Sequence, residues 1–257
     1  MTERFVGKVA LVTGATRGIG AATVRRLVRE GARVAFCGRT TDAGIALVEE
    51  LGGPEHVLYV AADLARAEDC AAIVDATVAH FGRLDILVNN AASVLRGTLE
   101  TTSADDFNAM IALNLRAPFL TMQRALPTFK AQFEREGAGG VIVNIGSINS
   151  YIGANNLMAY SASKGGLLTL SRNLANALGP WRIRVHVFNV GWVLTEGEEV
   201  IQRNEGASDD WAERAGATRP WGRLMVADDI ASAVAFYASD DAKVFSGGAI
   251  ALEQQPF

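Results

Sequence analysis

Two side chains beyond the middle of the chain are spaced for acid–base chemistry. Tyr160 and Lys164 are four residues apart, so on a helix they share one face, one turn from each other. A free tyrosine has a pKa of about 10 and is a poor base at neutral pH. A neighbouring ammonium lowers that pKa, which suits a group that takes a proton from an alcohol or gives one to a carbonyl. The alternative for this pair alone is an exposed pair on a helix surface.

A serine precedes this pair where a buried strand should end. The pattern of residues 141–145 (VIVNI) predicts a strand, and Ser147 follows it. Open parallel sheets bind ligands beyond the carboxyl ends of their strands. The Ser147 hydroxyl is therefore expected to hydrogen-bond a substrate oxygen.

A glycine-rich turn lies near the start of the chain. Residues 8–13 (KVALVT) predict a strand, which runs into Gly14, Gly18 and Gly20 at the start of a helical stretch. Glycines let the backbone turn tightly and approach a pyrophosphate, whose charge the helix N-terminus stabilises. The spacing G-x-x-x-G-x-G differs from the common G-x-G-x-x-G pattern. The alternative is a tight turn without a ligand.

Short runs rich in Val, Ile and Leu alternate with helical stretches along most of the chain. The predicted strands are residues 8–13, 33–37, 57–60, 84–89, 141–145 and 184–189. A typical helical stretch is 19–30, which Gly31 closes as a left-handed cap. This order predicts an α/β fold: a Rossmann-like, doubly wound parallel sheet with helices on both faces.

No Pro/Ser-rich linker or charge run divides the sequence, so residues 1–257 are expected to form a single domain. The least regular part is 195–221, where several glycines and Pro220 stand among many charges. We expect this segment to cross the sheet edge as a substrate lid. The alternative is a plain surface insertion.

Composition excludes several classes of protein. The 257 residues are 49% hydrophobic and 20% charged, which excludes intrinsic disorder. Two cysteines, Cys37 and Cys70, cannot build a disulfide framework, and three histidines without ligand spacing indicate no metal site. A net charge of −4 offers no basic field for nucleic acid. No apolar run reaches the ~20 residues of a membrane span and no secretory signal opens the chain, so a cytoplasmic protein without membrane contact is expected.

The motifs together resemble the short-chain dehydrogenase/reductase family, in its compact single-domain branch. The resemblance extends along nearly the whole chain. Its motifs are TGxxxGIG at 13–20, NNAA at 89–92, Asn114, the triplet Ser147, Tyr160 and Lys164, the segment NVGWVLT at 189–195, and SGG at 246–248. The departures from the family pattern are Ala92 for Gly, Val190 for Pro, and the tail EQQPF at 253–257 in place of DGG.

The resemblance implies roles for individual residues. The catalytic group would be Asn114, Ser147, Tyr160 and Lys164, with Asn114 holding a water that links Lys164 to solvent. The cofactor-binding set would be Gly14, Thr16, Arg17, Gly18, Ile19, Gly20, Arg39, Asp63, Leu64, Asn90, Ala91, Tyr160, Lys164, Gly191, Val193 and Thr195. Asp63 would contact the adenine, although it could instead cap a helix.

The end of the second strand bears on the choice of cofactor. An NAD site needs an acid there for the ribose hydroxyls, but Gly38 stands at that position and Arg39 follows. Arg39 and Arg17 suit a 2′-phosphate, which guanidinium groups grip through paired donors. NADP(H) is therefore favoured over NAD(H). The alternative for Arg39 is a solvated charge at a strand end.

These observations favour an NADP(H)-dependent enzyme that transfers hydride between the cofactor and a small secondary alcohol or ketone. Asn149, Tyr151 and Asn155 follow Ser147 and hint at a hydroxylated substrate, such as a sugar or polyol derivative. One alternative is a 3-oxoacyl-carrier-protein reductase, which would need a basic docking patch; only Arg96 and Arg116 are candidates. A non-catalytic cofactor-binding regulator is the other alternative, but the catalytic triplet is intact.

The helical stretch 157–178 bears on assembly. Leu167, Leu170, Leu174 and Leu178 form one stripe, whereas Leu168, Gly165 and Ala175 lie on other faces. A helix that is apolar all round is buried, and one sheet covers only one side of it. Together with the family resemblance, this predicts a homotetramer. The alternatives are a dimer, or a second face shielded by residues 122–140.

Overall fold

The computed structural model describes residues 3–255 and is built around one parallel sheet. The seven strands lie in the order β3-β2-β1-β4-β5-β6-β9, and every neighbouring pair is parallel. Their bounds are β1 Val9–Val12, β2 Arg33–Gly38, β3 Val57–Ala61, β4 Ile86–Asn89, β5 Val141–Ser147, β6 Arg184–Val190 and β9 Ala249–Leu252. The chain order reverses between β1 and β4, so the carboxyl ends of these two strands flank a crevice.

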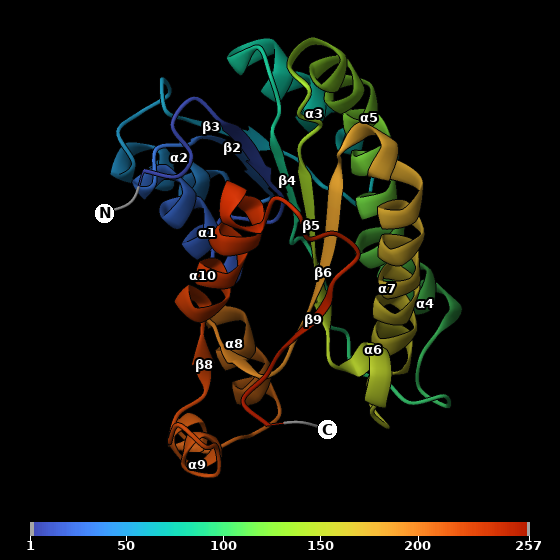
Figure 1. Cartoon of the computed structure of the whole chain (residues 1–257). Helices are drawn as coiled ribbons and strands as arrows, with labels where there is room; N and C mark the ends of the chain where they lie inside the picture. Colours follow the sequence, from blue (N-terminus) through green and yellow to red (C-terminus); the bar gives the residue numbers. More distant parts are fainter. Residues whose placement is uncertain (1–2, 256–257) are drawn as a thin grey trace.

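Helices cover both faces of this sheet (Figure 1). On one face lie α1 (Gly18–Arg29), α2 (Thr41–Glu50) and α10 (Ala227–Ala238). On the other lie α3 (Ala67–Phe81), α5 (Ala117–Glu136) and α7 (Met158–Leu178), with α4 (Ala104–Ile111) outside them. The short helices are η1 (Ala112–Arg116), α6 (Asn149–Ile152), η2 (Gly179–Trp181) and η3 (Asp240–Ala242). This is the doubly wound, Rossmann-like α/β fold that the sequence predicts.

The strands bury side chains on both faces, as a sheet covered on both sides requires. Along β1, Ala10 and Val12 join the core under α1 and α10, whereas Val9 and Leu11 join the core under α3 and α5. All four are fully buried. Truncating Leu11 to Ala would cost about 2–5 kcal/mol, typical of a buried leucine. This core holds the strand ends, and hence the site, in place.

The structure confirms all six predicted strands, with small shifts at their ends. β5 continues to Ser147, so this serine is the last residue of the strand rather than lying beyond it. The predicted strand 84–89 begins only at Ile86. Leu84 is held instead by Gln132 of α5, whose side-chain amide bonds both the N–H and the carbonyl of Leu84. The glycine cap after the first helix is confirmed, with Gly31 at φ +93°.

Residues 195–221 fold into two helices beyond the carboxyl end of the sheet. They are α8 (Glu196–Asn204) and α9 (Trp211–Ala217), flanked by the short parallel pair β7 (Val193–Leu194) and β8 (Met225–Val226). Figure 1 shows this group below the sheet, on the α10 side. Within residues 3–255, no helix has the length and apolar character needed to cross a membrane.

Candidate active site

The glycine-rich turn between β1 and α1 packs tightly against the segment after β4. A Cβ on Gly14 would lie 2.6 Å from the Ala91 Cα, and one on Gly20 would lie 2.6 Å from Asn90 Nδ2. The same Asn90 nitrogen donates hydrogen bonds of 2.9 Å to the carbonyls of Thr13 and Gly14. Glycine is therefore required at both positions, and Asn90 fixes the turn at the point where the strand order reverses.

A carboxylate from another part of the chain, that of Glu196, binds the backbone of the first turn of α1. Arg17 precedes the helix and gives no side-chain cap. Instead, Glu196 Oε2 accepts a hydrogen bond of 3.1 Å from the Gly18 N–H. A helix N-terminus stabilises negative charge through its free N–H groups and its dipole. The Gly18 N–H that binds the Glu196 carboxylate could therefore also bind the pyrophosphate of a dinucleotide.

The end of β2 is crowded by the side chain of Thr16, which an acidic side chain at position 38 would have to displace. A Cβ on Gly38 would lie 2.6 Å from Thr16 Cγ2, so the strand end is closed by the glycine-rich turn itself. Arg17 and Arg39 line this end of the cleft. Asp63 accepts a hydrogen bond from the Ala65 N–H at 3.1 Å, in the turn before α3. Because α3 begins at Ala67 with Arg66 as its N-cap, Asp63 is not the helix cap that the sequence left open.

A single cleft of about 1150 Å³ joins these parts to the predicted catalytic residues. Of the predicted site residues, those that line it are Gly14, Thr16, Arg17, Gly18, Ile19, Arg39, Asp63, Leu64, Asn90, Ala91, Ser147, Tyr160, Lys164, Gly191, Val193 and Thr195. Gly20 and Asn114 lie behind its wall. The cradle of glycines and the anion-binding turn fit a dinucleotide along this cleft.

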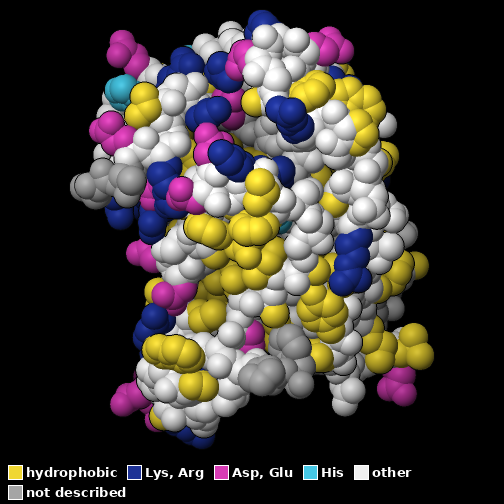
Figure 2. All heavy atoms as spheres, in the orientation of Figure 1, with side chains coloured by type: hydrophobic (Ala, Val, Ile, Leu, Met, Phe, Trp, Pro, Cys, Tyr) yellow, Lys and Arg dark blue, Asp and Glu magenta, His cyan; other side chains and the backbone are white. Residues whose placement is uncertain are grey.

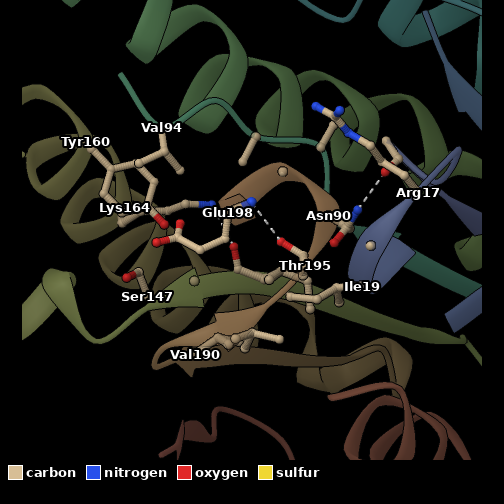
Figure 3. A pocket seen from close by; sticks show the side chains of 18 of the residues that line it. Arg17, Ile19, Asn90, Val94, Ser147, Tyr160, Lys164, Val190, Thr195 and Glu198 are labelled. Atoms are coloured by element: carbon tan, nitrogen blue, oxygen red, sulfur yellow. Dashed lines mark hydrogen bonds between the residues drawn. The ribbon is translucent and has the colours of Figure 1, made fainter. Parts of the chain in front are cut away.

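Ser147, Tyr160 and Lys164 meet at the carboxyl end of β5 (Figure 3). Ser147 is buried at the end of the strand, and its hydroxyl accepts a hydrogen bond of 3.2 Å from the Asn149 N–H. Lys164 stands one turn after Tyr160 on α7, and its Nζ donates 2.8 Å to the Ile145 carbonyl. The same Nζ lies 5.8 Å from the centre of the Tyr160 ring.

Burial changes the pKa of both titratable groups. It raises the pKa of Tyr160 above its ordinary value; the nearby Ser147 hydroxyl opposes this, and the charge of Glu198 adds to it. Burial also lowers the pKa of Lys164 to about 8. In the protein without cofactor the pKa of Tyr160 is therefore raised on balance, and the lowering of this pKa by Lys164 stays a prediction. The lysine is itself desolvated and bonded to the strand, so the positive nicotinamide ring would have to supply the rest of that effect.

Asn114 sits in a π-helical turn, η1, between α4 and α5. Its Oδ1 accepts a hydrogen bond from the Ser93 N–H, and its Nδ2 donates to the Ser93 carbonyl, both at 2.9 Å. Nδ2 also lies 3.1 Å from the Ser163 hydroxyl. Gly166 lets η1 approach α7, since a Cβ there would come 2.9 Å from the Leu115 side chain. The Asn114 side chain thus ties α7 to the segment after β4, and its water-holding role stays a prediction.

Among the charged groups in the cleft that sequence reasoning missed is the carboxylate of Glu198 on α8. Its side chain is 17% exposed and points toward Tyr160 (Figure 3). Gln202 and Glu205 line the same cleft. Positions 198, 202 and 205 share one helical face, so their spacing was a usable signal.

Three tryptophans lie in or next to residues 195–221. Trp192 lines the cleft, and the ring of Trp211 stacks on the ring of Trp192 with 5.8 Å between their centres. Trp221 is exposed.

Relatives with known names match over nearly their full length. The chain is 34% identical to trans-4-hydroxycyclohexanecarboxylate dehydrogenase of Sinomonas cyclohexanicum, over 98% of this chain and 94% of that protein. It is 35% identical to D-threitol dehydrogenase of Mycolicibacterium smegmatis, over 97% and 93%. It is 31% identical to the NADP-dependent (R)-specific alcohol dehydrogenase of Lentilactobacillus kefiri, over 98% of both chains.

Solved structures share the fold at similar identity. A blue fluorescent protein from a metagenomic library, in complex with NADPH, superposes with a TM-score of 0.85 at 33% identity, over 98% of both chains. A 3-ketoacyl-(acyl-carrier-protein) reductase from Brucella melitensis, complexed with NADH, gives 0.87 at 30% identity, over 97% of this chain and 98% of that one.

The family model of the short chain dehydrogenases matches residues 8–206, which include the glycine-rich turn, Ser147, Tyr160 and Lys164. The three relatives described above are named dehydrogenases. The chain therefore belongs to the short-chain dehydrogenase/reductase family, and is an NAD(P)-binding oxidoreductase that acts on CH–OH groups.

Proposed function

We propose that the protein interconverts a small secondary alcohol and its ketone with NADP(H). The observation that carries this proposal is the convergence of Ser147, Tyr160 and Lys164 in the same cleft as the glycine-rich turn. When bound, the nicotinamide would exchange a hydride with the carbinol carbon.

The protein's own residues would handle the proton and the oxygen. The Ser147 hydroxyl orients the substrate oxygen from the end of β5. The Tyr160 phenolate takes the proton from an alcohol, or the Tyr160 hydroxyl gives it to a ketone, because Tyr160 lines the same cleft as Ser147. Lys164 steadies the phenolate electrostatically and can bind the cofactor's ribose. Asn114 fixes α7 and the segment after β4 relative to each other.

The preference for NADP(H) rests on the end of β2. Gly38 carries no acid to bind ribose hydroxyls, and the Thr16 side chain occupies the place that such a side chain would enter. Two guanidinium groups, those of Arg17 and Arg39, line the cleft beside it. These groups support binding of a 2′-phosphate by charge-assisted hydrogen bonds.

A polyol or sugar derivative is the substrate class that we favour. The D-threitol dehydrogenase relative acts on a polyol, as its name states. An acyl-carrier-protein substrate has less support, because its candidate basic residues are engaged. Arg96 pairs with Glu198 on α8 and with Glu205 just after it, and Arg116 donates to the Ala65 carbonyl at 2.6 Å. We also propose that residues 195–221, which carry α8 over the cleft, serve as the substrate lid.

The test is a screen of the purified protein with NADP⁺ and NAD⁺ against polyols, sugars, steroids and simple secondary alcohols, and with NADPH and NADH against the ketones. Formation or loss of reduced nicotinamide is followed by absorbance. We expect turnover of hydroxylated secondary alcohols with NADP⁺. A protein that binds NADPH but turns over none of these compounds would instead support the non-catalytic regulator.

A further inference from the structure

The carboxylate of Glu198 is an unusual group to find beside a catalytic tyrosine. It comes from the first turn of α8, where the Thr195 hydroxyl accepts a hydrogen bond from the Glu198 N–H at 3.2 Å. This cap sets the direction of the side chain. Figure 3 shows the carboxylate lying between Thr195 and Tyr160, in the part of the cleft that Ser147 and Lys164 also line.

One oxygen of this carboxylate is held by the protein. Oε1 accepts hydrogen bonds from Trp192 Nε1 at 2.9 Å and from Gln202 Nε2 at 2.8 Å. A guanidinium nitrogen of Arg96 lies 3.9 Å from the same oxygen. Among residues 3–255, no hydrogen bond to Oε2 is formed. The anchoring of Oε1 thus fixes the group and leaves Oε2 as an acceptor for a ligand in the cleft.

The surrounding charges decide which donor suits Oε2. The charge of Glu198 is partly balanced by Arg96, which also pairs with Glu205. The Lys164 ammonium lies 5.8 Å from the centre of the Tyr160 ring and donates a hydrogen bond to the Ile145 carbonyl. A substrate carboxylate would be repelled by Glu198. A substrate ammonium would be attracted to Glu198 but repelled by the Arg96 guanidinium and the Lys164 ammonium. A neutral hydroxyl satisfies Oε2 without either penalty.

A substrate with a single hydroxyl has no hydrogen-bond donor left for Oε2 of Glu198. Its only hydroxyl is bound by Ser147 and Tyr160, so binding would strip water from Oε2 and leave it unpaired. Sites built to bind a substrate hydroxyl discriminate strongly against analogues that lack it, because their own buried polar group is left without a partner. We therefore expect the site to prefer substrates that carry a second hydroxyl on the carbon next to the reacting carbon.

We propose that Glu198 selects neutral vicinal diols, and the matching hydroxyketones, by accepting a hydrogen bond from the hydroxyl next to the reacting carbon. This inference rests on the proposed function and names the substrate class of that site. Glu198 is thereby assigned as a specificity-determining residue that touches the substrate.

The test compares four small substrates that differ only beside the carbinol: butane-2,3-diol, butan-2-ol, lactate and 3-aminobutan-2-ol, each with NADP⁺. We expect the diol to have the highest kcat/KM, at least about 10-fold above butan-2-ol. Glu198→Ala should bring the diol to within about 3-fold of butan-2-ol. Glu198→Gln, which keeps an acceptor but loses the charge, should retain part of the diol preference and raise the activity on lactate.

Glu199→Gln is the matched control, because Glu199 is exposed on the same helix. It should leave the order of substrates unchanged. Since Glu198 contributes to the raised pKa of Tyr160, Glu198→Gln should also move the acidic limb of the kcat profile for alcohol oxidation to lower pH, and the control should not. An unchanged diol preference in Glu198→Ala, or a wild type that prefers the amine or lactate, would overturn the proposal.

A binding measurement separates this inference from the proposed function. Calorimetry of Tyr160→Phe with NADP⁺ measures diol binding without turnover. Diol binding that Glu198→Ala weakens about 10-fold in this background would support the role of Glu198, even if the wild type turned over no substrate and the proposed function failed. Diol binding that is absent, or equal with and without Glu198, would overturn the role of Glu198 whatever the turnover.

Discussion

Glu196 Oε2 accepts a hydrogen bond of 3.1 Å from the backbone N–H of Gly18, which joins α8 to the first turn of α1. The carboxylate stands where the helix N-terminus would stabilise a pyrophosphate. Cofactor and carboxylate would therefore compete for the same N–H, and α8 carries Glu198 two residues further on. The cofactor turn and the segment over the substrate site are linked through this one contact.

Glu196→Gln should tighten cofactor binding. The amide removes a negative charge from the pyrophosphate position, and a change worth about 0.5–1 kcal/mol lowers the Kd for NADPH roughly 2- to 5-fold. Fluorescence titration of NADPH measures this. The exposed Glu199→Gln serves again as control. Weaker binding in Glu196→Gln would show that the carboxylate supports the cofactor rather than competing with it.

Arg39→Asp should shift the cofactor preference from NADP(H) toward NAD(H). It replaces a partner of the 2′-phosphate with a group that repels it and can accept from ribose hydroxyls. The ratio of kcat/KM for the two cofactors should change by at least about 10-fold toward NAD(H). A wild type that already works better with NAD(H) would contradict our interpretation of the β2 end.

The parallel sheet was predictable because its strands are buried on both faces. Val9–Val12 and Val141–Ser147 are almost continuous apolar runs, so each stands out against the amphipathic helices. Their ends were harder to predict, because tertiary contacts set them. The Gln132 side chain, 48 residues away in the sequence, takes the backbone groups of Leu84 out of the ladder.

The cofactor side of the cleft was also predictable, since a glycine-rich turn after a first strand has few other uses. Glu198 was not predicted, because a charged residue on a polar helix is usually a solvated one. The position of the Glu198 carboxylate in the cleft depends on Trp192 and Arg96, which come from the segments after β6 and β4. Likewise, the raised pKa of Tyr160 reflects burial, which the four-residue spacing to Lys164 does not reveal.

His186 should make the protein acid-sensitive. Burial, helped by the charge of Arg184, lowers its pKa to about 4, whereas an unfolded histidine titrates near 6.5. The unfolded chain binds more protons between these values, so stability falls as the pH drops through this window. From pH 7 to 5 this amounts to about 2 kcal/mol.

Urea unfolding of the wild type and His186→Phe at both pH values measures this effect. Phenylalanine keeps an aromatic ring against Tyr237, whose ring centre lies 5.0 Å from that of His186. The variant should lose about 2 kcal/mol less than the wild type over this range. Equal losses would mean that His186 is not the group responsible.

The protein should form a homotetramer. Leu167, Leu168 and Leu178 of α7 are buried within the protomer, which leaves less of this helix for a partner than the sequence suggested. Hydrophobic side chains also gather over α10 and toward the C-terminal strand (Figure 2). There Phe236 is 40% and Phe245 50% exposed, which is surface that a partner subunit could cover.

Light scattering at micromolar concentration should give a mass about four times the 27.3 kDa of one chain. Twice that mass would replace the tetramer with a dimer. A mass near 27.3 kDa would rule out any stable oligomer under these conditions.

Tyr160→Phe tests the central claim most directly, because it removes the proton carrier and keeps the ring that packs against the cleft. The measurement is kcat with the best substrate of the screen, alongside the Kd for NADPH. We predict that kcat falls by at least about 1000-fold while the Kd for NADPH stays within about 3-fold of the wild type. A Tyr160→Phe variant that keeps near-normal turnover would contradict the assignment of Tyr160 as the acid–base group.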